Sequence, residues 1–218
     1  MADEVKPAHA PKTAGRTIRS WARFYDAASW LLSFGRAPAI KKMIVEMAAA
    51  APGESVLDVG CGTGTLAIAL KAEAGGSGEV KGIDASPEMI EQARRKAARA
   101  GVDAGFEVAL IEEMPFTDAR FDLVVSSFML HHLPEDVKRK GLAEIRRVLK
   151  PGGRFLAVDF GQTGTSVMGH LMSMLGHGHG HASMEALAPA METAGFTDVE
   201  AGVTKYRAVA FLRGQAPP

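Results

Sequence analysis

The sequence has a single cysteine, Cys61, among 218 residues. No disulfide can form within the chain, so a reducing, cytoplasmic location is the simplest expectation. An excess of charge is also absent, because 25 Lys and Arg residues balance 25 Asp and Glu residues. A dedicated nucleic-acid-binding protein would carry a clear excess of basic residues, so nucleic acid is not an expected partner.

The sequence also lacks an apolar segment near its start. Residues 1–15 are polar and rich in Ala, Pro and Lys, which is typical of a disordered tail and not of a signal peptide. The chain as a whole is 47% hydrophobic and 23% charged, the composition of an ordinary globular protein. We expect a helical cap at residues 16–51 and one α/β domain at residues 52–218.

Segments with the patterns of strands and helices alternate from residue 52 onward. We expect strands at residues 55–60, 79–84, 106–110, 121–127, 154–160, 198–204 and 206–212, and helices at residues 65–74, 87–100, 134–149 and 183–194. The alternation predicts an α/β, doubly wound, mostly parallel seven-stranded sheet with helices on both faces. Almost no residues join the last two strands, so we expect them to form an antiparallel C-terminal hairpin. Pro189 would weaken or break the last helix.

Three glycines at alternate positions, Gly60, Gly62 and Gly64, follow the first expected strand and precede a helix. Glycine allows positive φ angles and lets a ligand approach the bare backbone. Asp84 ends the next strand, about 20 residues after the glycines, where a ribose-binding carboxylate is expected. Its oxygens can accept charge-assisted hydrogen bonds from both hydroxyls of a ribose.

The spacing of the glycines separates two classes of ligand. Dinucleotide-binding folds carry G-x-G-x-x-G, with the pyrophosphate at the helix N-terminus. Here Thr65 stands where the third glycine of that pattern would fall. Asp58, just before the glycines, would repel a phosphate and attract an ammonium group.

These motifs resemble those of class I S-adenosylmethionine-dependent methyltransferases. Within that superfamily the chain is similar to the branch of quinone-biosynthesis C-methyltransferases and bacterial phospholipid N-methyltransferases. The matching motifs lie, in order, at residues 56–64, 82–89, 113–124 and 147–155. The resemblance implies a Rossmann-like methyltransferase domain at residues 52–218, S-adenosyl-L-methionine as cofactor, and a small or lipidic acceptor such as a quinone precursor, a phenol or a phospholipid amine.

The resemblance also implies roles for individual residues. Asp58, Gly60 and Gly62 would hold the methionine part of the cofactor, and Asp84 its ribose. Further cofactor contacts are expected from Tyr25, Cys61, Gly64, Ala85, Met89, Leu110, Ile111 and Ser126. Relatives often place an acidic residue where Leu110 stands, to accept a bond from the adenine amino group. Either a backbone carbonyl replaces that acceptor or cofactor affinity is weaker.

His131 and His132 follow the fourth expected strand, at the rim of the predicted crevice. Histidine titrates near neutral pH and could take a proton from a phenol or an ammonium group. In the other, simpler interpretation the pair belongs to the loop and caps the next helix, because a His-His-Leu sequence is widespread in this superfamily whatever the acceptor. In the first interpretation, His131 and His132 are candidate catalytic bases.

Two segments outside these motifs have competing interpretations. Residues 16–47 place apolar side chains such as Trp21 and Tyr25 on one helical face, either as a lid with peripheral membrane contact or as a helix packed on the core.

His177, His179 and His181 carry donors suited to copper, nickel or zinc. The glycines between them give no fixed geometry, so we favour a mobile substrate lid over a metal site.

The sequence therefore predicts an S-adenosylmethionine-dependent methyltransferase. A non-catalytic module that binds an adenosyl ligand or a metal is the alternative class, because of Leu110 and the histidine tract. Cys61 lies near a helix N-terminus, which can lower the pKa of a thiol. We expect it to be a small buried residue of the loop and not a nucleophile.

Overall fold

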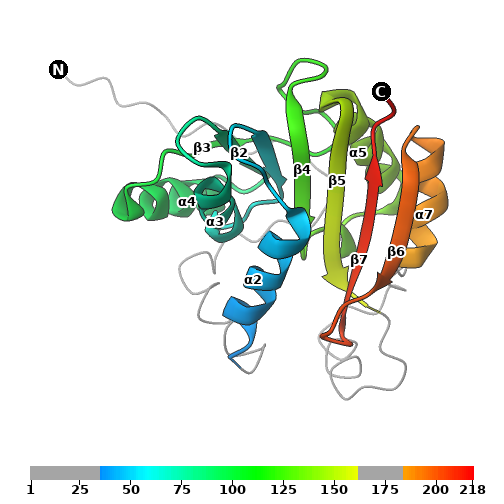
Figure 1. The fold of residues 1–218 in the computed structure, drawn as a ribbon, viewed down its shortest axis with the longest axis horizontal. Helices are drawn as coiled ribbons and strands as arrows, with labels where there is room; N and C mark the ends of the chain where they lie inside the picture. The colour runs from blue at the N-terminus through cyan, green and yellow to red at the C-terminus, as the bar shows by residue number, and fades with distance from the viewer. Residues whose placement is uncertain (1–34, 162–183) are drawn as a thin grey trace.

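The computed structural model describes residues 35–161 and 184–218 of the chain. The expectations for Tyr25, for the cap upstream of residue 35 and for His177, His179 and His181 lie outside these residues. The described elements, shown in Figure 1, are α2 (Ala37–Ala48), β1 (Ser55–Val59), α3 (Thr65–Ala74), β2 (Glu79–Asp84), α4 (Pro87–Ala100), β3 (Gly105–Val108), β4 (Phe121–Ser127), η1 (Leu130–His132), α5 (Glu135–Val148), β5 (Leu149–Phe160), α7 (Met184–Thr193), β6 (Thr197–Val203) and β7 (Val209–Gln215).

The strands of the described residues form one seven-stranded sheet in the order β3-β2-β1-β4-β5-β7-β6. Strands β1 to β5 are parallel, and β7 is antiparallel to both β5 and β6 (Figure 1). The expected mostly parallel sheet with an antiparallel C-terminal hairpin is confirmed. The strand order reverses between β1 and β4, and sheets of this kind bind ligands beyond the carboxyl ends of the strands at that point.

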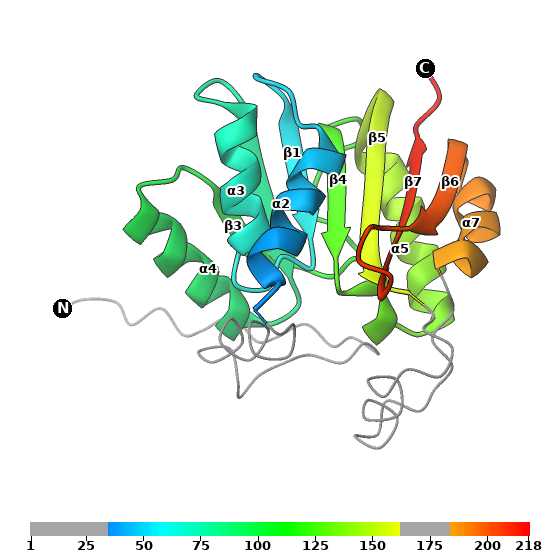
Figure 2. The ribbon, with the colours of Figure 1, turned by 60° about the horizontal axis from the view of Figure 1, so that its bottom comes forward.

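Neighbouring residues of the central strands supply two separate cores. On β1, Val56 belongs to a core cluster that includes residues of α2, α3 and α4, whereas Leu57 belongs to a second cluster that includes residues of α5 and α7. Figure 2 shows α2 and α3 on one face of the sheet and α5 on the other. Burial on both faces explains why the central strands are almost continuous apolar runs in the sequence.

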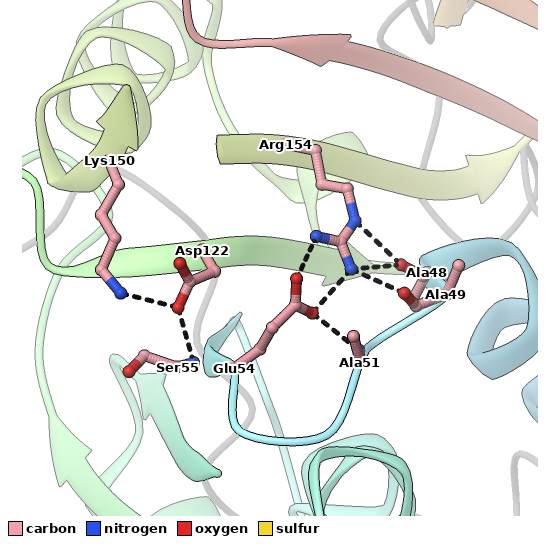
Figure 3. A network of polar contacts seen from close by, with 8 residues as sticks. All are labelled: Ala48, Ala49, Ala51, Glu54, Ser55, Asp122, Lys150 and Arg154. Atoms are coloured by element: carbon pink, nitrogen blue, oxygen red, sulfur yellow. Dashed lines mark hydrogen bonds and ion pairs between the residues drawn. The ribbon is translucent and has the colours of Figure 1, made fainter. Parts of the chain in front are cut away.

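Arg154 anchors α2 to the sheet at the amino end of β1 (Figure 3). Its guanidinium donates to both carboxylate oxygens of Glu54, at 2.7 and 2.8 Å, and to the carbonyl of Ala49 at 2.7 Å. A cation at the C-terminal carbonyls of a helix is favourable because it opposes the helix dipole. Hydrogen bonding by Arg154 lowers the pKa of Glu54. The C-terminus of α2 is therefore fixed at the amino ends of the strands, and the expected ligand site lies at their carboxyl ends.

Strand β5 begins earlier than expected. Leu149 already pairs with Phe121, and the ladder continues from the pair of Arg154 and Leu123 after an irregularity. The Pro-Gly-Gly segment therefore belongs to β5 and bulges out of its ladder with β4, as extra residues in a ladder do.

Helix α7 continues through Pro189. The lost backbone bond is offset because Met184, Leu187 and Met191 of the same helix are buried in the core. No helix in residues 35–161 and 184–218 has both the length and the apolar character needed to cross a bilayer.

Candidate functional site

The glycine loop leads from β1 into α3 with three left-handed residues. The φ angles of Gly60, Gly62 and Gly64 are 73°, 52° and 74°. The backbone N–H groups of Gly60 and Cys61 donate to the carbonyl of Ile83, at 2.8 and 2.9 Å, and so tie the loop to β2. Positive φ is costly for residues with a β-carbon, which explains the three glycines.

The three glycines have different surroundings. A β-carbon on Gly60 would lie 2.3 Å from Cγ of Met129, and one on Gly64 would lie 2.8 Å from the ring of Phe106. A β-carbon on Gly62 would meet no atom of the described residues within 4 Å. Side chains thus fill the spaces beside Gly60 and Gly64, and among these three glycines only Gly62 has a backbone that the residues at 35–161 and 184–218 leave open.

Asp84 at the end of β2 faces the glycine loop. Its carboxylate accepts hydrogen bonds from the N–H of Gly62 at 3.0 Å and from the N–H of Ser86 at 2.8 Å. Burial raises the pKa of Asp84, and these two N–H groups partly oppose the change. The loop after β1 and the start of α4 are therefore held by one carboxylate.

The residues after Asp84 start α4. Ser86 caps the helix, and its hydroxyl accepts a hydrogen bond from the N–H of Met89 at 3.3 Å. Met89 is buried, whereas Ala85 is half-buried. The order Asp-Ala-Ser-Pro therefore places Asp84 at the strand end and Met89 in the first turn of the helix.

Asp58 is a buried carboxylate at the centre of the sheet. Its exposed fraction is 0%, and neither of its oxygens has a hydrogen-bond partner among the described residues. Burial raises its pKa to about 7; the N–H of Ala67 lowers it without reaching hydrogen-bond geometry, and the charge of Asp84 raises it further. Buried carboxylates without partners are rare and costly, so this one calls for a donor from outside the described chain.

Ser126 on β4 shares this property. Its hydroxyl is buried and also lacks a partner in the described part of the chain. Val125, the residue before it, is level with Asp58 across the β1–β4 pair. All buried side-chain oxygens or nitrogens without a partner in residues 35–161 and 184–218 belong to Asp58 and Ser126. They therefore gather where the strand order reverses.

Cys61 lies within the glycine loop and is buried. Burial raises the pKa of its thiol well above the ordinary value, and the carboxylates of Asp58 and Asp84 add to the effect. A neutral, buried thiol is a poor nucleophile, so the expected structural role of Cys61 in the loop is supported.

Leu110 and Ile111 follow β3. Ile111 is 6% exposed, and a β-carbon on Gly141 of α5 would lie 2.6 Å from its Cγ1. Its side chain therefore packs against α5. Leu110 is half-buried, and its carbonyl accepts from the N–H of Glu113 at 3.3 Å. A carbonyl has a second lone pair, so this group keeps acceptor capacity.

A clamp from α5 holds the segment after Leu110. Glu144 accepts a hydrogen bond from the N–H of Met114 at 2.8 Å, and Arg147 donates to the carbonyl of Phe116 at 2.7 Å. Arg147 also pairs with Glu144 and lowers the pKa of that carboxyl. Met114, Phe116 and Arg147 lie within the sequence motifs and Glu144 lies outside them, and the sequence alone did not reveal that these residues bind each other.

His131 forms a buried pair with Asp159, a residue that sequence analysis missed. Nδ1 of His131 lies 2.6 Å from Oδ1 of Asp159, and the exposed fractions of the two side chains are 8% and 1%. Asp159 is near the end of β5, and His131 follows β4 in the 3-10 helix η1. The sequence signal was a single Asp near the end of an apolar strand, which is informative only once β4 and β5 are known to be neighbours.

Aromatic rings surround this pair at the carboxyl ends of β4 and β5. The ring of His131 lies 3.8 Å from that of His132 and 5.1 Å from that of Phe160, between centroids. Phe160 is 43% exposed and also contacts Phe128, at 5.0 Å. Phe128 has a φ of 52°, which is uncommon for a residue with a side chain and is often found at functional sites.

Comparison with known sequences finds a methyltransferase domain. Residues 56–153 match the model of a methyltransferase domain. The ubiquinone/menaquinone biosynthesis C-methyltransferase UbiE of Bdellovibrio bacteriovorus is 37% identical over 147 residues, which are 67% of this chain and 61% of that protein. Residues 56–153 therefore form a methyltransferase domain, similar to those of class I S-adenosylmethionine-dependent methyltransferases. The chain spans about three fifths of the length of such curated relatives.

Solved methyltransferase structures share the fold. An S-adenosylmethionine-dependent methyltransferase from Aquifex aeolicus superposes with a TM-score of 0.71 at 22% identity, over 92% of this chain and 100% of that one. Phosphoethanolamine N-methyltransferase 2 from Haemonchus contortus gives a TM-score of 0.71 at 19% identity, over 83% of this chain and 53% of that one. These similarities confirm the expected Rossmann-like methyltransferase fold.

Proposed function

We propose that this methyltransferase binds S-adenosylmethionine at the carboxyl end of β1 and methylates a quinone precursor. The observation that carries the cofactor assignment is the buried carboxylate of Asp58, which lacks a donor within the described residues. The ammonium group of the cofactor's amino-acid part supplies such a donor. Gly62, four residues later, leaves room for a ligand to lie against its backbone.

Asp84 suits the ribose. Each of its oxygens accepts one backbone N–H, and a carboxylate has about four lone-pair sites. Acceptor capacity therefore remains for the two ribose hydroxyls. The carbonyl of Leu110 offers a neutral acceptor for the adenine edge in place of an acidic side chain. These residues fit a nucleoside with a cationic amino-acid arm better than they fit a pyrophosphate.

When bound, S-adenosylmethionine supplies a methyl group already activated by its sulfonium. The protein then needs chiefly to align the acceptor and exclude water. His131 accepts the proton of an acceptor hydroxyl, or of the ring carbon after methylation. Phe128 and Phe160 form an apolar wall beside it that suits an aromatic ring.

The acceptor class rests on the relatives. UbiE, at 37% identity, carries a name that specifies C-methylation in ubiquinone and menaquinone biosynthesis. The aromatic wall at the ends of β4 and β5 agrees with a planar acceptor. A reduced quinone precursor has both a ring carbon that accepts a methyl group and a neighbouring hydroxyl that must lose its proton.

Two measurements on the full chain test the proposal. Calorimetry with S-adenosylhomocysteine should show binding with one site per chain, and NADH should show none. Incubation with tritiated S-adenosylmethionine and a short-chain demethylmenaquinol should transfer label to the quinol. Binding without transfer to quinol, lipid or small-molecule extracts would favour a non-catalytic adenosyl-binding module. Binding of NADH in place of S-adenosylhomocysteine would overturn the cofactor assignment.

A further inference from the structure

We infer that Asp159 is a positioning residue that fixes the tautomer and orientation of His131, so that Nε2 is the atom that accepts the acceptor's proton. This inference rests on the proposed function for its catalytic meaning. Its structural content, the tautomer of His131, can be tested without any acceptor.

The carboxylate of Asp159 is held by three donors. Oδ1 lies 2.6 Å from Nδ1 of His131 and accepts from the N–H of Phe160 at 2.8 Å. Oδ2 accepts from the N–H of His131 at 3.1 Å. Both oxygens are thus fixed by backbone groups that do not titrate, and the ring of His131 is directed by an acceptor that cannot rotate away.

This arrangement determines the chemistry of the imidazole. A carboxylate can only accept, so the Nδ1 atom facing Asp159 carries a proton, and the lone pair of neutral His131 lies on Nε2. When the O–H bond of an acceptor breaks, its electron pair stays on the acceptor oxygen and its proton forms a new N–H bond at Nε2. The resulting imidazolium is stabilised by the adjacent carboxylate, as in other pairs of histidine and aspartate.

Packing restricts the ring further. His131 is flanked by the rings of His132 and Phe160, at 3.8 and 5.1 Å between centroids. Asp159 on β5 and His131 after β4 are brought together because Ser127 pairs with Val158 in the parallel ladder. The pair is therefore positioned by the carboxyl ends of two adjacent strands, β4 and β5.

The tautomer test uses protein labelled with [15N]histidine and long-range proton–nitrogen NMR at pH 8. The signal of His131 is assigned by its loss in His131→Gln. We expect the Nδ1–H tautomer in the wild type and a mixture or the Nε2–H tautomer in Asp159→Asn. The Nε2–H tautomer in the wild type would overturn the inference, whatever acceptor the enzyme uses.

A double-mutant cycle tests the catalytic consequence with a short-chain demethylmenaquinol. Asp159→Asn should lower kcat about tenfold to a thousandfold while leaving the affinity for S-adenosylhomocysteine unchanged. In a His131→Gln background the same substitution should cost nothing further, because the two residues act as a unit. Independent, multiplying losses would contradict the inference. Asp122→Asn is the matched control and should keep full activity, because it removes a carboxylate near the amino end of β4, at the other end of the strand from His131.

Discussion

The side chain of Met129 fills the space that Gly60 leaves by lacking a side chain, since a β-carbon at residue 60 would lie 2.3 Å from Met129 Cγ. Gly60 belongs to the loop after β1, and Met129 to the segment after β4. The contact therefore joins the glycine loop to the segment that carries the candidate base.

Gly60→Ala should destabilise the protein through this contact. The positive φ costs about 1–2 kcal/mol with a β-carbon, and the overlap with Met129 adds about 1–3 kcal/mol. In a Met129→Ala background the overlap with Cγ is removed, so the cost of Gly60→Ala should fall, and what remains is the backbone cost plus the contact with Cβ of residue 129 at 2.8 Å. Urea denaturation of the four proteins measures both quantities. An equal cost of Gly60→Ala in both backgrounds would show that Met129 is not the obstacle.

Gly62→Ala should weaken cofactor binding more than it weakens the fold. Its φ of 52° predicts a backbone cost of about 1–2 kcal/mol, but no atom in the described part of the chain lies within 4 Å of the new β-carbon. That methyl group would enter the space assigned to the ligand. Calorimetry with S-adenosylhomocysteine should show at least about a tenfold loss of affinity, which corresponds to about 1.4 kcal/mol.

Gly101→Ala is the matched control for Gly62. Gly101 ends α4 with a φ of 63°, and a β-carbon at this position would also meet no atom of the residues that the structure describes within 4 Å. The two substitutions should cost similar stability, and only the one in the loop should affect binding. Equal affinities in both variants would place the ligand elsewhere.

Asp58→Asn should make stability less dependent on pH. The pKa of Asp58 is raised to about 7 in the folded protein, against about 3.9 in an unfolded chain. A raised carboxyl pKa stabilises the fold at acidic pH, and this stability is lost as the pH rises from about 4 to about 7. Between pH 5 and pH 8 the wild type should lose about 3 kcal/mol more than the variant, at about 1.4 kcal/mol per pKa unit.

Urea denaturation at the two pH values, without ligand, measures this difference. Asp103→Asn, which replaces an exposed aspartate, controls for the general loss of a negative charge. Parallel pH profiles of wild type and Asp58→Asn would mean that Asp58 is solvated or paired in solution.

Asp84→Ala should lower the affinity for S-adenosylhomocysteine by about tenfold or more, because charge-assisted hydrogen bonds to the ribose are lost. The loop is affected too, since the N–H groups of Gly62 and Ser86 lose their acceptor. Glu79→Gln, at the other end of β2, should leave the affinity unchanged. An unchanged affinity in Asp84→Ala would disprove the placement of the ribose.

Arg154→Ala should destabilise the fold by about 2 kcal/mol without changing cofactor affinity. The substitution removes a two-bond ion pair with Glu54 and the bonds to the end of α2. Arg213→Ala is the comparison, because Arg213 and Glu200 are both 53% exposed and such pairs contribute less than about 1 kcal/mol. Denaturation midpoints that fall equally in the two variants would refute a special role for Arg154.

Much of this structure could be predicted because the relevant signals are local. The caps of α4 at Ser86 and Gly101, and the apolar runs of the strands, specify elements without reference to the rest of the chain. The glycine loop and Asp84 could be linked because each ends a strand of a parallel sheet. The early start of β5 and the continuation of α7 through Pro189 could not be predicted, because tertiary strand pairing and burial decide them.

The site contacts that sequence analysis missed all join distant segments. His131 and Asp159 are 28 residues apart, and their pairing depends on the register of β4 against β5. Met129 reaches Gly60 only because β4 lies beside β1. That Asp58 has no hydrogen-bond partner within residues 35–161 and 184–218 is likewise a property of the packed sheet, because a sequence shows a carboxylate but not which donors surround it.

The reversed strand β7 has a consequence for how this enzyme can change. Because Val209 at its start pairs with Phe160, the turn at residues 204–208 emerges beside the aromatic wall, on the opposite side of β4 from the glycine loop. On the proposed function, a longer turn or a changed turn sequence should alter the acceptor side and leave the nucleoside side intact. Substrate range and cofactor use should then be separable in this molecule, and libraries confined to the hairpin tip would offer a route to new acceptors.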